Sequence, residues 1–426
     1  MRYCARCLYP ENAKPAIIFD DEGVCSGCRY HESREGINWR EREKKLSEIL
    51  EEYKKKARKK SNPYDCIVPV SGGKDSHYQV WLLKEVYGMN PLLVTFNHGF
   101  NSYLGLENLR NLVNKSGCDL LRFTANPHSV KKVSRYMLKK VGDLTWHYHA
   151  GIRTLPFQVA VKYKIPLIVW GEHGFAELTG MFTLDDMVEF TKWTRQEHDM
   201  RGFEPEDLIN KESGVTGQDI VPYIYPTDEE IERINAKGIY LSNFVYWNAK
   251  DQADLMIKKW GFKQMDRPRD RTFVLYAKID DHANDVHDFL KYLKFGYGRT
   301  TDDASMEIRH GRMTREEGIK LVNKYDHVVP RTLNTYLRFL GISEKEFYDA
   351  VEPMRDLNIW QKNPDGTWET TDSVANHLND PEVENARVRQ VNDRTFSKRN
   401  EYLYYNPFKK KARIKNKSAS EEFIIL

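Results

Sequence analysis

The stretch "CIVPVSGGKDSHYQV", residues 66–80, decides the fold of this chain. It begins with a short apolar run that contains Ile67, Val68 and Val70, as expected for a buried strand. A serine, two glycines, a lysine, an aspartate and a second serine follow, and then a segment with helical spacing. The sequence therefore predicts a strand that turns through a glycine-rich loop directly into a helix.

This loop has the composition of a phosphate-binding site. Backbone N–H groups converge where such a turn enters a helix, and the helix N-terminus carries the positive end of the helix dipole. Glycines permit φ > 0 and the close approach of a ligand. The predicted contacts to a pyrophosphate are Ser71, Gly72, Gly73, Lys74, Asp75 and Ser76.

The lysine in this loop supplies a point charge, and the hydroxyls of the two serines can donate hydrogen bonds. The aspartate would repel a bare phosphate, so we expect it to orient the loop or a Mg²⁺ ion. The motif differs from the loop G-x-x-x-x-G-K-S/T, because the lysine follows the glycine pair directly. The alternative is an ordinary glycine turn without a ligand.

The region around this loop alternates between short apolar runs and helical patterns. Strands are predicted at residues 66–70, 91–96, 119–125 and 166–170. Helical stretches are predicted near residues 76–88, 103–116, 128–140 and 149–164. The alternation predicts the α/β class, with a parallel sheet covered on both faces. Ligands of such sheets bind at the carboxyl ends of the strands, where the glycine-rich loop falls.

Four of the six cysteines lie within the first 28 residues, as "CARC" and "CSGC". These pairs, Cys4 with Cys7 and Cys25 with Cys28, have the spacing of a structural four-cysteine zinc site. An iron–sulfur cluster is the alternative, because thiolates also bind iron. Cys66 and Cys118 are expected to be small buried residues.

The rest of the chain gives a provisional domain division. Residues 1–35 form the zinc module, 36–62 an amphipathic linker helix, and 63–260 the catalytic domain. Residues 261–355 form a substrate-binding helical region, and 356–426 a polar carboxyl-terminal extension. Within the helical region, Thr314 and Glu317 predict a capping box.

The composition is that of a globular protein, with 40% hydrophobic and 30% charged residues and a net charge of +4. This near balance gives no sign of nucleic-acid binding over the whole surface. No apolar run is long enough to span a bilayer, and "MRYCARCLYP" lacks the apolar core of a signal peptide. We therefore expect a cytoplasmic protein.

The motif "SGGKDS" after a strand resembles the signature of the PP-loop ATP pyrophosphatase superfamily. The resemblance implies an adenine nucleotide alpha hydrolase-like domain that splits ATP between its α- and β-phosphates and adenylates a substrate oxygen. A nitrogen or sulfur nucleophile then displaces AMP. The implied cofactors are Mg²⁺ and ATP beside the structural Zn²⁺. Carried onto this sequence, the further ATP-binding residues would be Asn97, His98, Arg153, Gly171 and Glu172, with His149 and His173 as candidate bases. Either His98 or His173 could instead be a polar residue at a strand end.

Over residues 1–355 the chain resembles the N-acetyl sugar amidotransferases of bacterial surface-glycan and flagellin-glycan biosynthesis. The matching stretches are "CARCLYPENAKPAIIFDDEGVCSGC", "SNFVYWNAKDQ" and "LKFGYGRTTDDASMEIRHGRMTREEGI". The resemblance implies a C–N ligase that converts an acetamido group into an acetamidino group, on a nucleotide-linked or acidic sugar. It implies ammonia from separate glutaminase and cyclase-like channel subunits. Lipopolysaccharide biosynthesis is one setting for such an enzyme.

The last of these stretches gathers Arg299, Arg309 and Arg312, whose guanidinium groups suit carboxylates and phosphates. We predict that they bind the substrate. The alternative is that they form ion pairs with Asp302, Asp303 and Glu307 on a solvated loop.

Two other functions remain open. Some tRNA thiolases share the amino-terminal module and the loop, but they need a cysteine pair or cluster-binding cysteines in the catalytic domain. Here that region has only Cys66 and Cys118, and no cysteine follows residue 118. A non-catalytic zinc-ribbon protein could bind RNA through the basic segments 54–60 and 409–417; its affinity would fall steeply with salt.

Overall fold

The computed structural model describes residues 1–381 and 383. At its centre is a five-stranded sheet with the strand order β3-β2-β1-β4-β5, in which every neighbouring pair is parallel. The strands are β1 (Cys66–Pro69), β2 (Pro91–Asn97), β3 (Leu120–Thr124), β4 (Leu167–Trp170) and β5 (Lys237–Tyr240). The parallel α/β class is confirmed, and the four predicted strands are present. The fifth strand, β5, was not predicted.

Helices cover both faces of the sheet. Since side chains alternate along each strand, each strand contributes to both apolar cores. Ile67 faces one apolar core, which includes Val133 and Phe157. Val68 faces the other core, which includes Leu112. The helices of the first core are α5 (Pro127–Val141) and α6 (Trp146–Tyr163). Those of the second core are α2 (Trp39–Lys59), α3 (Lys74–Trp81) with η2 (Leu82–Val86), α4 (Tyr103–Ser116) and α11 (Ala249–Trp260).

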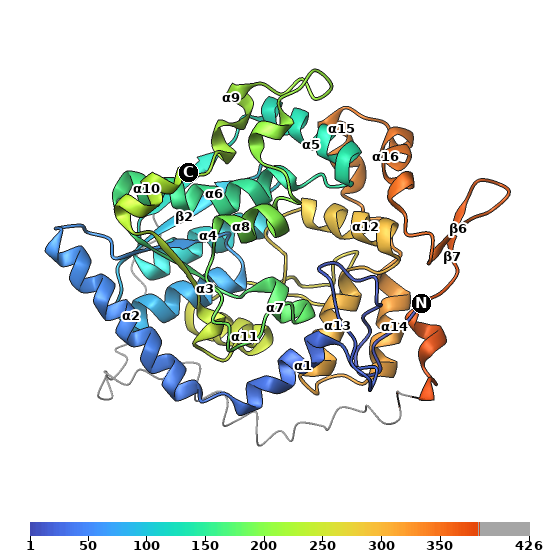
Figure 1. The fold of residues 1–426 in the computed structure, drawn as a ribbon, viewed down its shortest axis with the longest axis horizontal. Coiled ribbons are helices and arrows are strands. Elements are labelled where there is room, and N and C mark those ends of the chain that lie inside the picture. Colours follow the sequence, from blue (N-terminus) through green and yellow to red (C-terminus); the bar gives the residue numbers. More distant parts are fainter. Residues whose placement is uncertain (382, 384–426) are drawn as a thin grey trace.

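The segment between β4 and α11 consists of short elements and long loops. These elements are α7 (Gly174–Thr179), α8 (Lys192–Thr194), η3 (Arg195–Asp199), η4 (Pro205–Leu208), α9 (Gly217–Ile220), η5 (Val221–Tyr223), α10 (Asp228–Ile234) and η6 (Leu241–Asn243). Of these, η3, η5 and α10 pack against α6, and α9 packs against α5 (Figure 1). The chain then enters the edge strand β5, and η6 follows it.

The amino-terminal module precedes the linker helix. Its irregular first segment leads into α1 (Ser26–Ser33) and η1 (Arg34–Gly36), after which Asn38 caps the long helix α2. The predicted amphipathic character of α2 is confirmed, because Leu46, Leu50 and Tyr53 are all buried against the sheet domain.

The carboxyl-terminal region is mainly helical, as predicted. Its elements are α12 (Ala283–Phe295), α13 (Arg299–Arg309), α14 (Arg315–Tyr325), α15 (Leu333–Leu340), α16 (Glu344–Val351), η7 (Glu352–Met354), the hairpin β6 (Trp360–Lys362) and β7 (Trp368–Thr370), and η8 (Val374–His377). The predicted capping box of Thr314 and Glu317 opens α14. The blue amino-terminal segment lies against the orange helices α13 and α14 (Figure 1), where Leu8 packs with Ala304 and Ile308.

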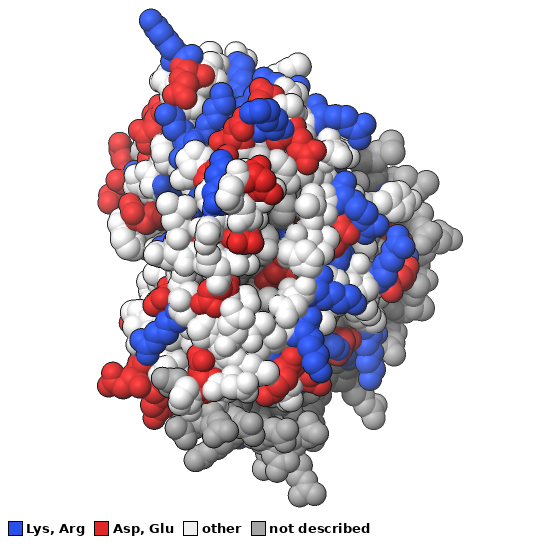
Figure 2. All heavy atoms as spheres, turned by 90° about the vertical axis from the view of Figure 1, so that its right-hand side faces the viewer, with Lys and Arg blue, Asp and Glu red and all other residues white. Residues whose placement is uncertain are grey.

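The surface carries charges of both signs. On the face drawn in Figure 2, Lys and Arg are interspersed with Asp and Glu around a largely uncharged centre. In the part of the chain that the structure describes, no helix is both long and apolar enough to cross a membrane. The basic segment 54–60 belongs largely to α2, whereas the segment 409–417 and most of the predicted carboxyl-terminal extension lie outside the described residues.

Candidate active site

The glycine-rich loop leads from the carboxyl end of β1 into α3. Gly72 has φ +89°, and a Cβ atom there would lie 2.5 Å from the carbonyl oxygen of Gly105, so this position needs glycine. Ser76 Oγ accepts a hydrogen bond from the Ser71 N–H at 2.9 Å, and Ser71 Oγ accepts one from the Gly73 N–H at 3.3 Å. The two serines therefore fix the turn that was predicted to hold phosphates.

Lys74 and Asp75 open the helix and form an ion pair. Lys74 Nζ lies 2.6 Å from both carboxylate oxygens of Asp75. Burial lowers the pKa of Lys74, but Asp75 and Glu172 more than offset this effect, and the net pKa is raised. Lys74 is therefore a fixed positive charge at the helix N-terminus.

The position of the loop in the sheet favours a ligand site. The chain runs from β1 outward through β2 to β3 and then returns to place β4 on the other side of β1, so the strand order reverses at β1. Open α/β sheets bind their ligands at such a switch point. A cavity of about 520 Å³ opens here, and the loop residues Ser71, Gly73, Lys74, Asp75 and Ser76 line it.

Most of the residues predicted from the superfamily motif also line this cavity, namely His98, Arg153, Gly171 and Glu172. The Arg153 guanidinium lies over the Trp170 ring at 4.8 Å, and its Nε donates to Asp199 Oδ1 at 3.1 Å. Asn97 is not among the lining residues; its amide donates to Thr124 Oγ1 at 2.9 Å. Asn97 is the last residue of β2, but its side chain does not line the cavity. Its contact with an adenine stays a prediction.

The two candidate bases differ in position. His149 lines the cavity, and burial holds its pKa well below the usual range, so its ring is neutral. His173 is not a lining residue; it is the N-cap of α7, and its Nδ1 accepts a hydrogen bond from the Ala176 N–H at 3.3 Å. This capping contact gives His173 a structural explanation, in line with the alternative of a polar residue at a strand end.

The three arginines of the last matching stretch do not act as one group. Arg299 and Arg312 line the cavity. Arg299 binds both oxygens of Asp288, at 3.0 and 2.9 Å, and Arg312 pairs with Glu307. Arg299 also contacts Asp302 at 3.3 Å. The alternative therefore named Asp302 and Glu307 correctly and missed Asp288. Both arginines lie on or just after a helix rather than on a solvated loop.

Arg309 does not reach the cavity. It is 3% exposed, and its guanidinium contacts the sulfur atoms of Cys7 and Cys25. The substrate-binding role predicted for Arg309 is therefore corrected. The helix α13 directs residues 299, 303 and 306 toward the cavity and Arg309 toward the cysteine module.

The cavity lining includes residues that the sequence did not suggest as site candidates, among them Lys278 and Asp303. Lys278 has φ +56°, which is unusual for a residue with a side chain. Among the described residues, no carboxylate forms an ion pair with it, whereas Lys74, Arg153 and Arg299 all have acidic partners. Burial and the nearby charge of Arg299 lower the pKa of Lys278, although nearby carboxylates oppose the shift. Lys278 is therefore a lysine of the cavity wall without a direct ion pair.

Several carboxyl groups in the cavity have raised pKa values. Burial and then the nearby charge of Asp75 raise the pKa of Glu172 to about 7, although Lys74 opposes the shift. Burial raises the pKa of Asp303 to about 6, against the lowering effects of Arg299 and of the hydrogen bond from Thr272. Perturbed carboxyl groups grouped in a cavity are typical of functional sites.

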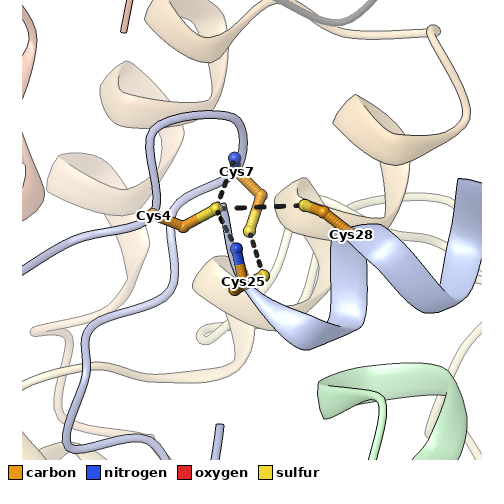
Figure 3. Close-up of side chains that lie close together, drawn as sticks. All are labelled: Cys4, Cys7, Cys25 and Cys28. Atoms are coloured by element: carbon orange, nitrogen blue, oxygen red, sulfur yellow. Dashed lines mark hydrogen bonds between the residues drawn. The ribbon is translucent and has the colours of Figure 1, made fainter. Parts of the chain in front are cut away.

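The four cysteines form a second site at the amino terminus (Figure 3). Their sulfur atoms lie within 4.8 Å of one another, with Cys4 to Cys28 at 4.0 Å and Cys7 to Cys25 at 3.6 Å. A tetrahedral zinc ion with Zn–S bonds of about 2.3 Å requires S···S distances of about 3.8 Å. All four cysteines are buried and free of disulfides, so the residues fit a structural metal ion.

Comparisons with known proteins give one family match and one relative. Residues 257–375 match the family described as "LPS biosynthesis protein WbpG-like, C-terminal domain". A stretch of 118 residues is 30% identical to "Uncharacterized protein MJ1599" of Methanocaldococcus jannaschii, covering 28% of this chain and 41% of that relative. The family match agrees with the surface-glycan resemblance predicted from the sequence.

Two solved structures resemble the chain weakly. NMN synthetase from Francisella tularensis has a TM-score of 0.27 and 15% identity, and NH3-dependent NAD synthetase from Campylobacter jejuni has a TM-score of 0.26 and 12% identity. Each likeness covers 47% of this chain and 92% of the other chain. Likenesses at these TM-scores carry no weight for function.

Proposed function

We propose that this chain, which carries a WbpG-like carboxyl-terminal domain, is an ATP-dependent, AMP-forming N-acetyl sugar amidotransferase. It would adenylate the acetamido oxygen of a nucleotide-linked or acidic sugar and replace that oxygen with nitrogen from ammonia. The observation that carries the proposal is the glycine-rich loop at the switch point of the sheet, which opens into a cavity lined by cations and carboxyl groups.

ATP would bind with its β- and γ-phosphates at residues 71–76. The backbone N–H groups of this loop and the N-terminus of α3 suit phosphate oxygens. Lys74, freed from Asp75 by the arriving phosphates, would stabilise the charge that develops on pyrophosphate. Asp75 and Glu172 would hold Mg²⁺ together with the phosphates, since Mg²⁺ commonly binds one or two carboxylates and substrate phosphates.

The acceptor would occupy the part of the cavity formed by the carboxyl-terminal region. Lys278 suits an anionic group of the sugar, because it lines the cavity and no carboxylate among the described residues forms a direct ion pair with it. Arg299, already bound to Asp288, would add to the positive potential there. The cavity thus has separate places for the phosphates of ATP and for an anionic acceptor.

The reaction would proceed in two steps. In the first step the acetamido oxygen bonds to the α-phosphorus, and the bond from that phosphorus to the bridging oxygen breaks, so that pyrophosphate leaves. In the second step ammonia bonds to the activated carbon and gives up one proton. The carbon–oxygen bond then breaks, AMP leaves with the original acetamido oxygen, and the amidine remains.

Asp303 is our candidate for the proton acceptor. Its pKa of about 6 lets it be ionised at neutral pH and still accept a proton. The neutral His149 lines the same cavity and is the second candidate. Neither residue needs to form a covalent bond to the substrate. We further propose that ammonia comes from separate glutaminase and channel subunits.

The other candidate functions have less support. The cavity lining in the described part of the chain includes no cysteine, so the thiolase alternative has no candidate sulfur carrier there. In the basic segment 54–60, Lys54 is buried and bonded to the carbonyl oxygen of Tyr87, and Lys56 pairs with Glu52. These lysines are less available to an RNA backbone than the sequence suggests.

The proposal is tested by incubating the purified chain with Mg²⁺, ATP, an ammonium salt and a panel of acidic and nucleotide-linked N-acetyl sugars. We expect AMP and pyrophosphate in equal amounts, and a sugar product in which NH has replaced O. Both should depend on the sugar. Formation of ADP, or AMP formation that needs tRNA rather than any sugar, would contradict the proposal.

A further inference from the structure

Arg309 lies between the cysteine module and the wall of the cavity. It is the last residue of α13 and is 3% exposed. The residues of α13 that line the cavity lie on a different side of the helix from Arg309. A buried guanidinium needs compensating partners, and Arg309 finds them on both sides.

On one side, Arg309 contacts the cysteine sulfurs. Its Nη2 lies 3.7 Å from Cys7 Sγ and 3.5 Å from Cys25 Sγ. Four thiolates around one divalent ion carry a net charge of −2, which is costly to bury without a nearby cation. Arg315 is a second cation beside the module, but it donates to the carbonyl oxygens of Cys4 and Cys7 rather than to sulfur.

On the other side, Arg309 holds the end of α7. Its Nη1 donates to the carbonyl oxygens of Glu177 at 3.2 Å and of Leu178 at 2.8 Å. Carbonyl groups in the last turn of a helix lack partners within the helix, and a cation there is favourable. Glu177 and Leu178 also line the cavity, so Arg309 supports the cavity wall from behind.

The module packs tightly on the same short helix. Ser26 Oγ donates to the carbonyl oxygen of Thr179 at 2.5 Å. A Cβ atom on Gly27 would lie 2.7 Å from the carbonyl oxygen of Leu178 and would also collide with Arg309. The buried ion pair of Arg34 and Glu177 adds a further connection. The amino-terminal module therefore sets where α7 lies.

We infer that Arg309 is a positioning residue that stabilises the metal-bound cysteine cluster and ties it to α7, so that metal binding fixes one wall of the active-site cavity. The metal module would then be part of the machinery that shapes the site, and removal of the metal would loosen α7. The inference does not depend on which reaction the cavity performs.

The experiment compares the full-length protein with Arg309→Met and Arg309→Lys, and with Arg331→Met as a control for an exposed arginine. Zinc and iron content are measured, and metal affinity is determined by competition with a chelator. Amide hydrogen exchange is followed across residues 174–180, with α10 as a reference helix. These readouts do not depend on catalytic activity.

We expect Arg309→Met to weaken metal affinity by about 10- to 100-fold, as is usual when a partner of a metal ligand is lost. Exchange in α7 should become faster in this variant, and equally so in the wild-type protein after chelation. Arg309→Lys should retain more metal affinity than Arg309→Met, but with faster exchange in α7, because an ammonium group cannot span both sets of contacts. The control and α10 should not change.

The inference is overturned if Arg309→Met binds metal as tightly as the wild type. It is also overturned if chelation leaves exchange in α7 unchanged. If Arg309→Met fails to fold, chelation of the wild-type protein still shows whether the metal controls α7. Arg309→Lys then shows whether the guanidinium group makes that connection.

Discussion

Lys74 and Asp75, adjacent at the start of α3, hold each other in an ion pair with both oxygens 2.6 Å from Nζ. The lysine is 6% exposed, whereas about a third of the aspartate side chain, 34%, is exposed. In the free protein the Asp75 carboxylate thus neutralises the charge of Lys74. A triphosphate with Mg²⁺ would give each partner a new counter-charge.

Replacement of Lys74 should abolish most of the chemistry. In Lys74→Ala we expect AMP formation to fall by about 100- to 1,000-fold, the usual effect of removing one group that stabilises transition-state charge. The measurement is the rate of sugar-dependent AMP release at saturating ATP. Lys84→Ala, on the adjoining π-helical turn η2, is the control; a Lys74 variant that matched it would refute the assigned role.

The proton acceptor predicts a pH profile. Asp303 must be ionised to act, so activity should rise as pH increases through about 6 and then level off. The concentration of free ammonia must be held constant across the series. In Asp303→Asn we expect a loss of about 100-fold or more in kcat and no rise near pH 6. A profile unchanged from the wild type would exclude Asp303, and Asp254→Asn, on the exposed side of α11, is the control.

Lys278 predicts a selective effect on the acceptor. Lys278→Met should raise KM for an acidic sugar by about 10- to 100-fold, since a hydrogen bond to a charged group contributes about 1.5–3 kcal/mol. KM for ATP should change little, and Lys278→Arg should retain most of the affinity. An equal rise in KM for ATP would instead place the lysine on the nucleotide phosphates.

A buried carboxyl group in α2 predicts how stability varies with pH. Glu43 is 0% exposed, and neither of its oxygens has a hydrogen-bond partner among the described residues. Burial raises its pKa to about 9, with a small opposing effect of Arg40. The folded state therefore keeps the proton more tightly than the unfolded state, whose pKa is about 4.3.

This stabilising contribution is complete below about pH 4 and is lost as pH rises toward 9, by at most about 1.4 kcal/mol for each pH unit. The wild type should thus lose thermal stability between pH 5.5 and pH 8.5, and Glu43→Gln should lose less. Thermal unfolding at the two pH values measures this difference. Glu48→Gln, at an exposed position of the same helix, should behave as the wild type does. Equal losses in all three proteins would show that Glu43 is not the cause.

The sequence predicted the centre of the fold well because the signals there are local. The apolar run of β1, the two glycines and the helical spacing after them are contiguous, so strand, loop and helix could be read in order. The strand β5 was missed because it spans only Lys237–Tyr240 and contributes a single long aliphatic residue, Ile239.

The acceptor side of the cavity could not be predicted in the same way. Lys278 follows a segment without periodicity, and only the packing of the carboxyl-terminal region brings it to the cavity. The arginines were grouped by closeness in sequence. Once α13 is known to be a helix, residues 299, 303, 306 and 310 form one face by their spacing, and Arg309 falls outside it.

The histidines show another limit of the sequence. His149 and His173 were both predicted as candidate bases, and the sequence alone offered no means of choosing between them. Only the structure distinguishes a residue that lines the cavity from one that caps α7.

The central claim, that the acetamido oxygen is adenylated, is tested most directly by an isotope. An N-acetyl sugar labelled with oxygen-18 in the acetamido carbonyl is converted with ATP and ammonia in ordinary water, and the AMP is examined by mass spectrometry. The account predicts that the label appears in the phosphate of AMP and is absent from the amidine product. Unlabelled AMP formed together with product would show that water, and not the sugar oxygen, attacks ATP, and would contradict the account.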